Sequence, residues 1–321
     1  LKPFWIQPPR PTPPLALAMQ VAKRARASAR LIPELSGAKL VIFDKDGTLT
    51  HCDKCFGPWV GRVASALAER GFVREQHAFF TALGYDPKLG TFTKDSPVVH
   101  GSNDDVRESA AREAFRQADT GGAYDDFRAG FLRDTAGAWA VAPDLLTSDT
   151  LEPCGDVAGV LGACLAEGAR VAVCTSDDRV VTERVAEVLG LAEFGIGAAE
   201  IACGDDEAIA RKPQPDGICR LCLSAGVEPA EAIMVGDSFT DMLAGIRAGC
   251  PRLVFVESGG HTAAELLQHF CGVDYIEVAK AEGLPDVIVR SASLPTEAPA
   301  GETDRVVMNA MPSIDGMLDR S

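Results

Sequence analysis

Four short, mostly apolar runs recur along the chain, and each is followed by a polar turn and then by apolar residues at helical spacing. The runs are Leu40–Phe43, Arg170–Cys174, Ala232–Val235 and Arg252–Val256. Unbroken apolar runs of this length are typical of strands buried on both faces, as in parallel sheets. Their alternation with helices predicts the α/β class, with a doubly wound parallel sheet.

Three helices are predicted among these strands. Val180–Leu189 carries apolar residues at helical spacing behind a polar start, and Phe239–Ala248 does the same. Pro213–Ala225 is the third, because Pro215 stands near its start and Gly226 stands just past its end. Together with the strands, they complete the pattern expected of a doubly wound core.

More than a hundred residues lie between the first two runs without a convincing strand. Four stretches in them have helical periodicity: Trp59–Arg70, Arg74–Leu83, Val106–Ala118 and Phe127–Trp139. Gly84–Asn103 is rich in Gly, Pro, Asp and Thr, and we expect a loop too polar and irregular for a core. The sequence therefore predicts a helical cap at 55–150, inserted as a lid into a core made of 39–54 and 151–293.

The composition limits the partners and the compartment. A hydrophobic content of 46% in 321 residues is enough for a large core, and the net charge of -15 argues against a nucleic-acid-binding surface. No run approaches the roughly 18 apolar residues of a membrane span. Ten cysteines without a signal-like start fit a reducing compartment, so we expect a cytoplasmic protein.

The two ends of the chain differ in composition from the middle. Residues 1–38 are rich in Pro, Ala and Arg, and Glu34 is their only acid. The stretch from Met19 to Leu31 is basic and rich in Ala and Ser, which is typical of a mitochondrial or plastid transit peptide. We expect a disordered leader or such a peptide here, and a disordered tail at 294–321.

Two carboxylates follow the first apolar run directly. Asp44 and Asp46 flank Lys45 and precede Gly47, which frees the backbone to turn. Side chains two positions apart on an extended segment point the same way, so both carboxylates are expected to face one small volume. That volume lies beyond the carboxyl end of a buried strand, where open α/β sheets bind their ligands. One carboxylate of such a pair can attack or bind a metal while the other transfers protons.

Later strands end in further polar groups. Thr175-Ser176 offers a hydroxyl and backbone N–H groups at a helix start, Lys212 supplies a cation, and Asp237 and Asp241 form a second acid pair. Each has a simpler explanation, such as a helix cap, a solvated lysine or first-turn acids. Their order, each after its own strand, favours one shared site. Carboxylates gathered at a point repel unless a cation joins them, and Mg²⁺ prefers oxygen ligands.

The four motifs occur in the order and form of the haloacid dehalogenase-like superfamily, which the chain resembles over roughly residues 39–257. An acid at Asp46 argues against haloacid dehalogenases proper, which lack one there. P-type pumps place threonine at that position and need membrane spans. An insertion directly after the first motif is similar to that of the helical-cap group, which includes phosphoglycolate phosphatases and β-phosphoglucomutases.

The resemblance implies a role for each residue of the phosphoryl-transfer site. Asp44 would be the nucleophile that becomes an aspartyl phosphate, and Asp46 the general acid and then the base. Thr175 and the backbone N–H of Ser176 would bind the phosphoryl group. Lys212 would neutralise the nucleophile and the phosphoryl oxygens.

The resemblance also implies a Mg²⁺ site. The carboxylates of Asp44 and Asp237 and the backbone carbonyl of Asp46 would hold the ion. Asp241 would orient metal-bound water or Lys212, or bind the metal directly.

Taken together, these motifs lead us to expect Mg²⁺-dependent hydrolysis of a small phosphorylated metabolite, with a phosphoglycolate-like monoester as the first candidate. A β-phosphoglucomutase-like phosphomutase shares the catalytic set, and a nucleotidase or pyrophosphatase stays open. A phosphoaspartate signalling module is the alternative from another class. Asp46 argues against it, because a proton donor speeds turnover whereas a switch needs a long-lived phosphate.

Four cysteines and a few cap side chains could also serve as metal ligands or substrate contacts. Cys52 and Cys55, together with Cys219 and Cys222, have the spacing of zinc ligands, but the later pair lies in an apolar helical pattern and we expect free thiols. Trp59 is expected to be packing. Three cap side chains are possible contacts for an anionic end of the substrate, although each alone is more often solvated: Arg62, Arg74 and His77.

Overall fold

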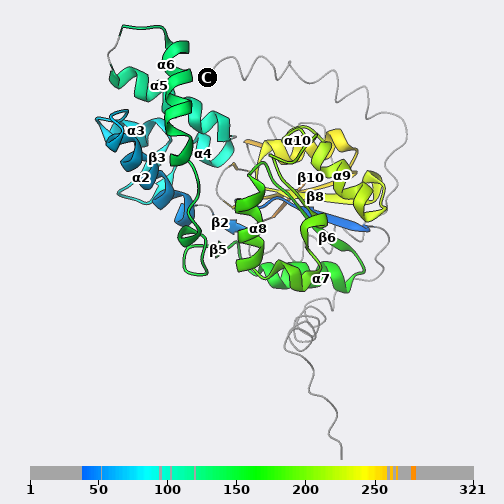
Figure 1. Cartoon of the computed structure of the whole chain (residues 1–321). Coiled ribbons are helices and arrows are strands. Elements are labelled where there is room, and N and C mark those ends of the chain that lie inside the picture. The colour runs from blue at the N-terminus through cyan, green and yellow to red at the C-terminus, as the bar shows by residue number, and fades with distance from the viewer. Residues whose placement is uncertain are drawn as a thin grey trace, which may run out of the picture.

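The structure is a computed structural model. It describes residues 38–51, 53–93, 96–101, 103–118, 121–258, 261–262, 265–266 and 276–279. The expected tail at 294–321, Cys52 and all of the expected leader except Ala38 lie outside the described residues. A helical unit (α2 to η2) stands beside a unit built on a sheet (Figure 1).

The sheet is parallel throughout, which confirms the predicted fold class. Within the described part of the chain its strand order is β10-β9-β8-β1-β6-β7. The strands are β1 (Leu40–Phe43), β6 (Arg170–Cys174), β7 (Ile201–Ala202), β8 (Ala232–Gly236), β9 (Arg252–Val256) and β10 (Ile276–Ala279). All four predicted strands are present, and β1 lies between β6 and β8, so the ends of these three strands meet.

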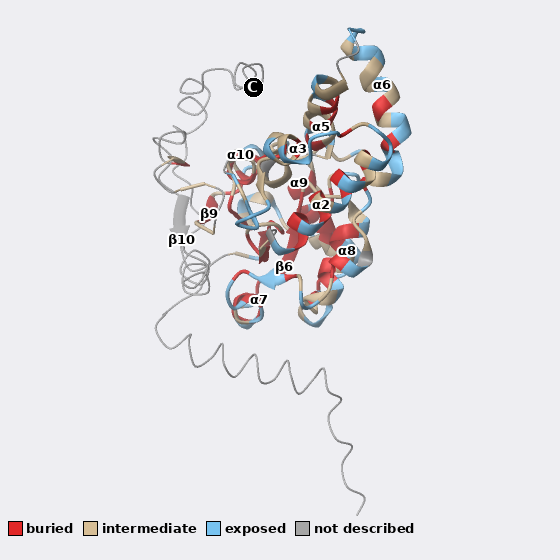
Figure 2. Ribbon diagram, turned by 90° about the vertical axis from the view of Figure 1, so that its left-hand side faces the viewer, coloured by how far each residue is buried: buried red, intermediate tan, exposed pale blue. Residues whose placement is uncertain are grey.

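Helices cover both faces of the sheet, because alternate side chains of each strand point to opposite faces. Val41 and Phe43 pack against α7 (Val157–Ala166), and Leu40 and Ile42 belong to the core on the α9 and α10 side. The other helices of this unit are α8 (Arg179–Val188), α9 (Asp216–Ala225), α10 (Phe239–Ala248), and the 3₁₀ turns η3 (Leu191–Phe194), η4 (Ala198–Glu200) and η5 (Pro229–Glu231). Figure 2 shows buried residues concentrated in the strands and on the inner sides of the helices.

The predicted helix that ends before Gly226 is shorter than the sequence suggested. The helix expected at Pro213–Ala225 begins only at Asp216, because the residues before it form a turn in which the Gln214 N–H donates to the Arg211 carbonyl over 2.9 Å. Its end agrees with the prediction, since Gly226 adopts a left-handed conformation (φ 64°) that glycine tolerates without strain.

The helical unit has its own apolar core. It consists of α2 (Asp53–Glu69), α3 (Gln76–Ala82), α4 (Pro97–His100), α5 (Asn103–Ala118), α6 (Tyr124–Thr135), η1 (Ala136–Ala138) and η2 (Pro143–Leu145). Phe79 and Phe131 are fully buried in this core, which continues onto Val181 and Val185 of α8. The packing of the helical unit is therefore shared with the sheet unit at α8.

The expectation of a surface loop at Gly84–Asn103 was wrong. The segment forms a hairpin of β3 (Tyr85–Asp86) and β4 (Thr91–Phe92), followed by α4. Tyr85 and Phe92 pack ring against ring with centroids 4.9 Å apart, and Ser96 is fully buried, with its hydroxyl donating to the Leu83 carbonyl over 2.7 Å. Aromatic packing outweighs the turn-rich composition here.

Two chain crossings join the units. The crossings are β2 (Thr50–His51) and β5 (Glu152–Pro153), which pair antiparallel. An ion pair also links them, since the Lys54 ammonium lies 2.5 Å from the Glu152 carboxylate. We propose residues 55–150 as a separate cap domain on this ground. In the described part of the chain, no helix is long and apolar enough to cross a membrane.

Candidate active site

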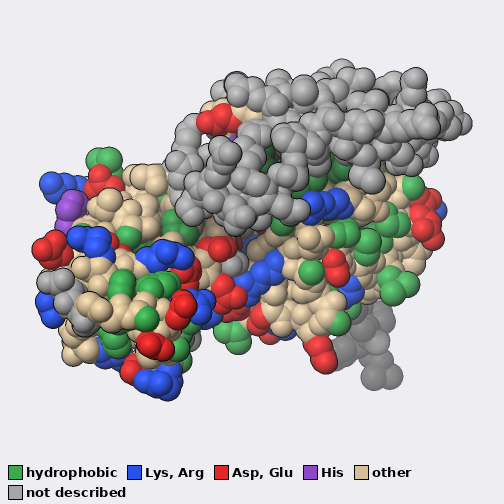
Figure 3. Space-filling model, turned by 90° about the horizontal axis from the view of Figure 1, so that it is seen from above, with side chains coloured by type: hydrophobic (Ala, Val, Ile, Leu, Met, Phe, Trp, Pro, Cys, Tyr) green, Lys and Arg blue, Asp and Glu red, His purple; other side chains and the backbone are tan. Residues whose placement is uncertain are grey.

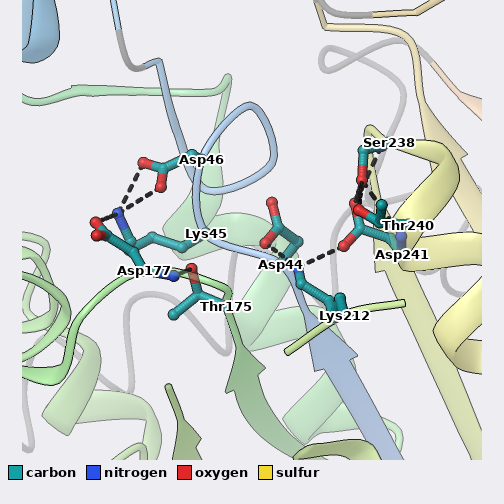
Figure 4. A network of polar contacts seen from close by, with 9 residues as sticks. All are labelled: Asp44, Lys45, Asp46, Thr175, Asp177, Lys212, Ser238, Thr240 and Asp241. Carbon is teal, nitrogen blue, oxygen red and sulfur yellow. Dashed lines mark hydrogen bonds and ion pairs between the residues drawn. The ribbon is translucent and has the colours of Figure 1, made fainter. Parts of the chain in front are cut away.

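A cavity of about 350 Å³ lies between the carboxyl ends of β1, β6 and β8 and the helical unit. Figure 4 shows five of the residues predicted from the motifs close together: Asp44, Asp46, Thr175, Lys212 and Asp241. Asp241 lies behind Lys212 and does not itself line the cavity. The residues that line the cavity from the sheet side include Asp44, Asp46, Thr175, Ser176, Lys212 and Asp237. Viewed from above, acidic and basic side chains both lie along the junction of the two units (Figure 3).

Lys212 is a buried cation between two carboxylates, not a solvated lysine. Its ammonium donates to Asp44 Oδ1 and to Asp241 Oδ1, each over 2.5 Å, and its side chain is only 5% exposed. Burial alone lowers the pKa of Lys212, but the charges of Asp241 and Asp44 outweigh it and raise the pKa well above its usual value. Lys212 therefore stays charged beside the proposed nucleophile.

Asp241 is fixed by the start of α10. Its Oδ2 accepts hydrogen bonds from the Ser238 N–H over 3.0 Å and from the Ser238 hydroxyl over 2.6 Å. A Cβ on Gly236 would lie 2.4 Å from this carboxyl group, so only glycine allows the approach. Asp241 thus serves as a helix-capping acid and also as a partner of Lys212.

Asp237 lies against the turn that follows the first strand. Gly47 has φ 77°, and a Cβ there would lie 2.0 Å from Asp237 Oδ2. Among the described residues, no hydrogen bond reaches the Asp237 carboxylate, although the residue is only 5% exposed. Burial, then the charges of Asp44 and Asp241, raise its pKa well above the usual range. A buried carboxylate without a donor needs a cation beside it.

The chemistry of this donor set fits a magnesium ion. Oxygen atoms of Asp44, Asp237 and Asp241 all lie within 4.8 Å of one another. Burial raises the pKa of Asp44 to about 7, with Lys212 opposing the rise. Carboxylate oxygens are what a hard dication prefers, and such an ion would offset the burial and the mutual repulsion that raise the pKa values of Asp44 and Asp237.

Asp46 lines the same cavity but has a different partner. Both of its carboxylate oxygens accept hydrogen bonds from the Lys45 ammonium, over 2.8 and 2.6 Å, and Lys45 also donates to Asp177 Oδ2 over 3.0 Å. The sequence interpretation gave Lys45 and Asp177 no role. On an extended segment Lys45 would point away from both Asp44 and Asp46, so the sequence pattern gave no signal for this contact.

The turn after β6 presents polar groups to the cavity. The Thr175 hydroxyl accepts a hydrogen bond from the Asp177 N–H over 3.1 Å, within the turn before α8. Thr175 therefore does not cap the helix, whose N-cap is Asp178. The Thr175 N–H is used by the Ala202 carbonyl over 2.9 Å, whereas the Ser176 N–H makes no hydrogen bond within the described residues. A free N–H at this position can bind an anionic oxygen.

The helical unit contributes other residues than those predicted for a substrate contact. Arg62 instead pairs with Asp144 at the surface over 2.5 Å, and neither Arg74 nor His77 lines the cavity. Arg107 lines it, as do the rings of Trp59 and Trp139. The expectation that Trp59 packs in the core is confirmed, since it is 6% exposed, but it also faces the cavity.

The cysteine pairs form no metal centre in the part of the chain that the structure describes. Cys55 and Cys222 are buried free thiols, and Cys219 is an exposed one. None of them belongs to a group of possible metal ligands. Burial raises the pKa of Cys55 to about 12, which keeps its thiol protonated and weakly nucleophilic.

Comparison with known proteins gives a consistent set of relatives. A family model described as haloacid dehalogenase-like hydrolase matches residues 38–249, well over half of the chain. A phosphoglycolate phosphatase from Rhodospirillum rubrum is 39% identical over 113 residues, 35% of this chain and 44% of that protein. A phosphoglycolate phosphatase from Escherichia coli K12 is 30% identical over 95 residues, 30% of this chain and 36% of that protein. The matches thus span less than half the length of either relative.

Solved structures share the fold. A protein from Haemophilus somnus described as a predicted phosphoglycolate phosphatase has a TM-score of 0.55 at 21% identity, covering 78% of this chain and 98% of that one. A haloacid dehalogenase-like protein of unknown function from Agrobacterium tumefaciens has a TM-score of 0.50 at 19% identity, covering 80% of this chain and 100% of that one. These likenesses concern the fold alone.

Proposed function

The chain belongs to the haloacid dehalogenase-like hydrolase family, and from this membership we propose that it hydrolyses a small phosphate monoester with Mg²⁺. The observation that carries the proposal is the buried hydrogen-bonded group of Asp44, Lys212 and Asp241, of which Asp44 and Lys212 line the cavity together with Ser176. The Ser176 N–H makes no hydrogen bond within the described residues. A nucleophile, a fixed cation and an anion-binding N–H are what phosphoryl transfer requires.

In the first half-reaction an oxygen of Asp44 attacks the phosphorus, and the bond from phosphorus to the ester oxygen breaks. Lys212 neutralises charge on the attacking carboxylate and on the phosphoryl oxygens, while Thr175 and the Ser176 N–H orient those oxygens. Asp46, which lines the same cavity, gives a proton to the departing alkoxide. The products are the alcohol and an aspartyl phosphate.

In the second half-reaction the roles of the two carboxylates change. Asp46, now ionised, removes a proton from a water molecule that attacks the phosphorus of the aspartyl phosphate. The bond to Asp44 breaks, inorganic phosphate leaves, and Asp44 returns as a carboxylate. The helical unit would act as a lid that excludes bulk water during transfer.

Asp44, Asp237 and the backbone carbonyl of Asp46 are the groups we assign to Mg²⁺. When bound, the ion would supply positive charge against the phosphoryl oxygens. Asp241 we assign to holding Lys212, because both of its oxygens are already engaged by Lys212 and Ser238. This choice selects one of the three roles that the sequence left open for Asp241.

A screen of phosphorylated metabolites tests the function directly. With Mg²⁺ present, we expect phosphate release from at least one monoester, and the relatives make phosphoglycolate the first to assay. Chelation with EDTA should lower the rate about 100-fold or more, and added Mg²⁺ should restore it, because the oxygens of Asp44, Asp237 and Asp241 lie within 4.8 Å of one another and suit a cation. The panel includes a sugar 1-phosphate, whose conversion to the 6-phosphate without phosphate release would indicate a mutase. No release from any ester, or release indifferent to EDTA, would contradict the proposal.

A further inference from the structure

The wall of the cavity that faces the catalytic carboxylates is mostly apolar. It comes from the helical unit and includes Phe56, Trp59, Val98, Val99, Val106 and Trp139. Both indole N–H groups are used internally: Trp59 donates to the Trp139 carbonyl over 3.3 Å, and Trp139 donates to the Thr135 hydroxyl over 3.1 Å. The two rings therefore offer a ligand carbon surface and no hydrogen-bond donor.

One charged side chain interrupts this wall. Among the described residues of the helical unit that line the cavity, only Arg107 is charged. Its nearest carboxylate, Asp104, lies 3.4 Å away and is 79% exposed, so this pairing is weak. On the same helix, Arg112 pairs with Glu108 over 2.8 Å and Arg116 with Glu113 over 2.7 Å. Arg107 is thus the arginine of α5 left available to a ligand in the cavity.

We propose that the substrate is a phosphate monoester whose leaving group has an apolar body ending in an anionic group. The proposal rests on the phosphatase function proposed above. The apolar body would pack on Trp59 and Trp139, and a carboxylate at its far end would bind Arg107. Glycolate, with a single methylene, would leave most of this wall without contact. The side chains of the wall thus specify a larger and more apolar leaving group than that of phosphoglycolate.

Three alkyl esters separate the parts of this proposal. 4-(Phosphonooxymethyl)benzoate has the ring and the carboxylate, benzyl phosphate has only the ring, and phosphoglycolate has only the carboxylate. We expect kcat/KM for the benzoate ester to exceed that for each of the others by about tenfold or more, because a charge-assisted hydrogen bond and a buried ring each contribute at this scale. If kcat/KM is higher for phosphoglycolate than for the benzoate ester, the proposal that the leaving group has an apolar body is wrong.

Two arginine variants test the anion site. Arg107→Gln should lower kcat/KM for the benzoate ester about tenfold and leave benzyl phosphate unchanged. Arg112→Gln, the same change on the same helix but outside the cavity, should alter neither. An equal effect of Arg107→Gln on both esters would overturn the role of Arg107. Failure of the wild type on every ester would instead count against the phosphatase function itself.

A second inference concerns Lys45, which joins two loops of the site. Its side chain is 2% exposed, and its ammonium contacts Asp46 after β1 and Asp177 after β6. The Asp177 N–H in turn donates to the Thr175 hydroxyl. Asp46 and Asp177 hold the Lys45 pKa well above its usual value despite burial, so the ammonium persists. Figure 4 shows the four side chains as one connected group.

We infer that Lys45 is a positioning residue that fixes the Asp46 carboxyl relative to the phosphoryl-binding turn. A proton donor must lie within hydrogen-bond reach of the leaving oxygen, so a freely rotating Asp46 would donate less often. Water attack on the aspartyl phosphate is common to all esters, so the selective effect should appear in kcat/KM, which covers only the steps up to that intermediate. There it should appear only where protonation of the leaving group limits the transfer. A purely structural role would lower the rate for every ester alike.

Leaving-group dependence tests this inference. Lys45→Met should lower kcat/KM about tenfold or more for benzyl phosphate and at most about threefold for p-nitrophenyl phosphate, whose phenolate departs without a proton. Lys54→Met, an exposed lysine nearby, is the control and should change neither. Asp177→Asn keeps the side-chain shape and should show the same selectivity between the two esters with a smaller fall. It replaces Lys45→Met as the test variant if Lys45→Met does not fold. An equal fall for both esters would overturn the inference.

Discussion

Replacing Asp44 by asparagine is expected to abolish phosphate release, with a loss of about 10⁴-fold or more in kcat. The amide keeps the shape of the side chain but is a poor nucleophile, and it removes one of the two carboxylates that we assign to the metal. Lys212 keeps an acceptor in the amide oxygen, so the fold should survive. The measurement is phosphate release under saturating substrate and Mg²⁺, with circular dichroism to check the fold.

A matched control variant tests whether the loss of activity is specific to Asp44. Asp149→Asn makes the same chemical change at an exposed position outside the cavity and should leave the rate unchanged. If Asp44→Asn instead releases phosphate at a rate comparable to the wild type, Asp44 is not the nucleophile. The mechanism proposed above would then have to be abandoned.

The second large effect is expected at Asp46. Asp46→Asn should lower kcat for alkyl phosphates by about 10²- to 10⁴-fold, because the amide can neither protonate the alkoxide nor activate water. Mg²⁺ affinity should be largely kept, since the ligand proposed from this residue is its backbone carbonyl. Lys45 would still donate to the amide oxygen, which preserves the local arrangement. Calorimetric Mg²⁺ titration and steady-state kinetics measure the two quantities separately.

The two measurements also define the contrary outcome. A severe loss of Mg²⁺ affinity with Asp46→Asn would place the Asp46 side chain, and not its carbonyl, on the metal. An unchanged kcat for alkyl esters would show that another group donates the proton. Comparison with Asp44→Asn is informative, because only that variant removes a carboxylate that we assign to the ion.

The strands were predictable where an unbroken apolar run met a polar turn. Leu40–Phe43, Arg170–Cys174 and Arg252–Val256 agree with the structure residue for residue. β7 was missed because two residues, Ile201–Ala202, carry too little pattern to be recognised. The hairpin at Tyr85–Phe92 was missed for another reason, since its aromatic packing depends on neighbours that local composition does not reveal.

The site was predictable to the extent that it follows strand ends. In a parallel sheet, side chains after adjacent strands share one edge, so the strand ends were enough to place Asp44, Thr175 and Asp237 together. Lys212 follows β7, which the sequence did not reveal, and only the order of the motifs indicated its place. The cavity wall was not predictable in this way. Arg107 and Trp139 are far apart in sequence, and only helix packing brings both to the cavity.

By itself, the sequence determined the sheet, the order of the motifs and the residue types of the site, because hydrophobic periodicity and strand ends are local properties. The tertiary structure decided which charges are buried and with whom they pair. From the sequence alone, Lys212 could have been a solvated lysine and Lys45 had no assigned role. In the folded protein both ammonium groups are buried against carboxylates. The energy of a charge depends on its solvent exposure and its neighbours in space, and neither is encoded at a single position of the chain.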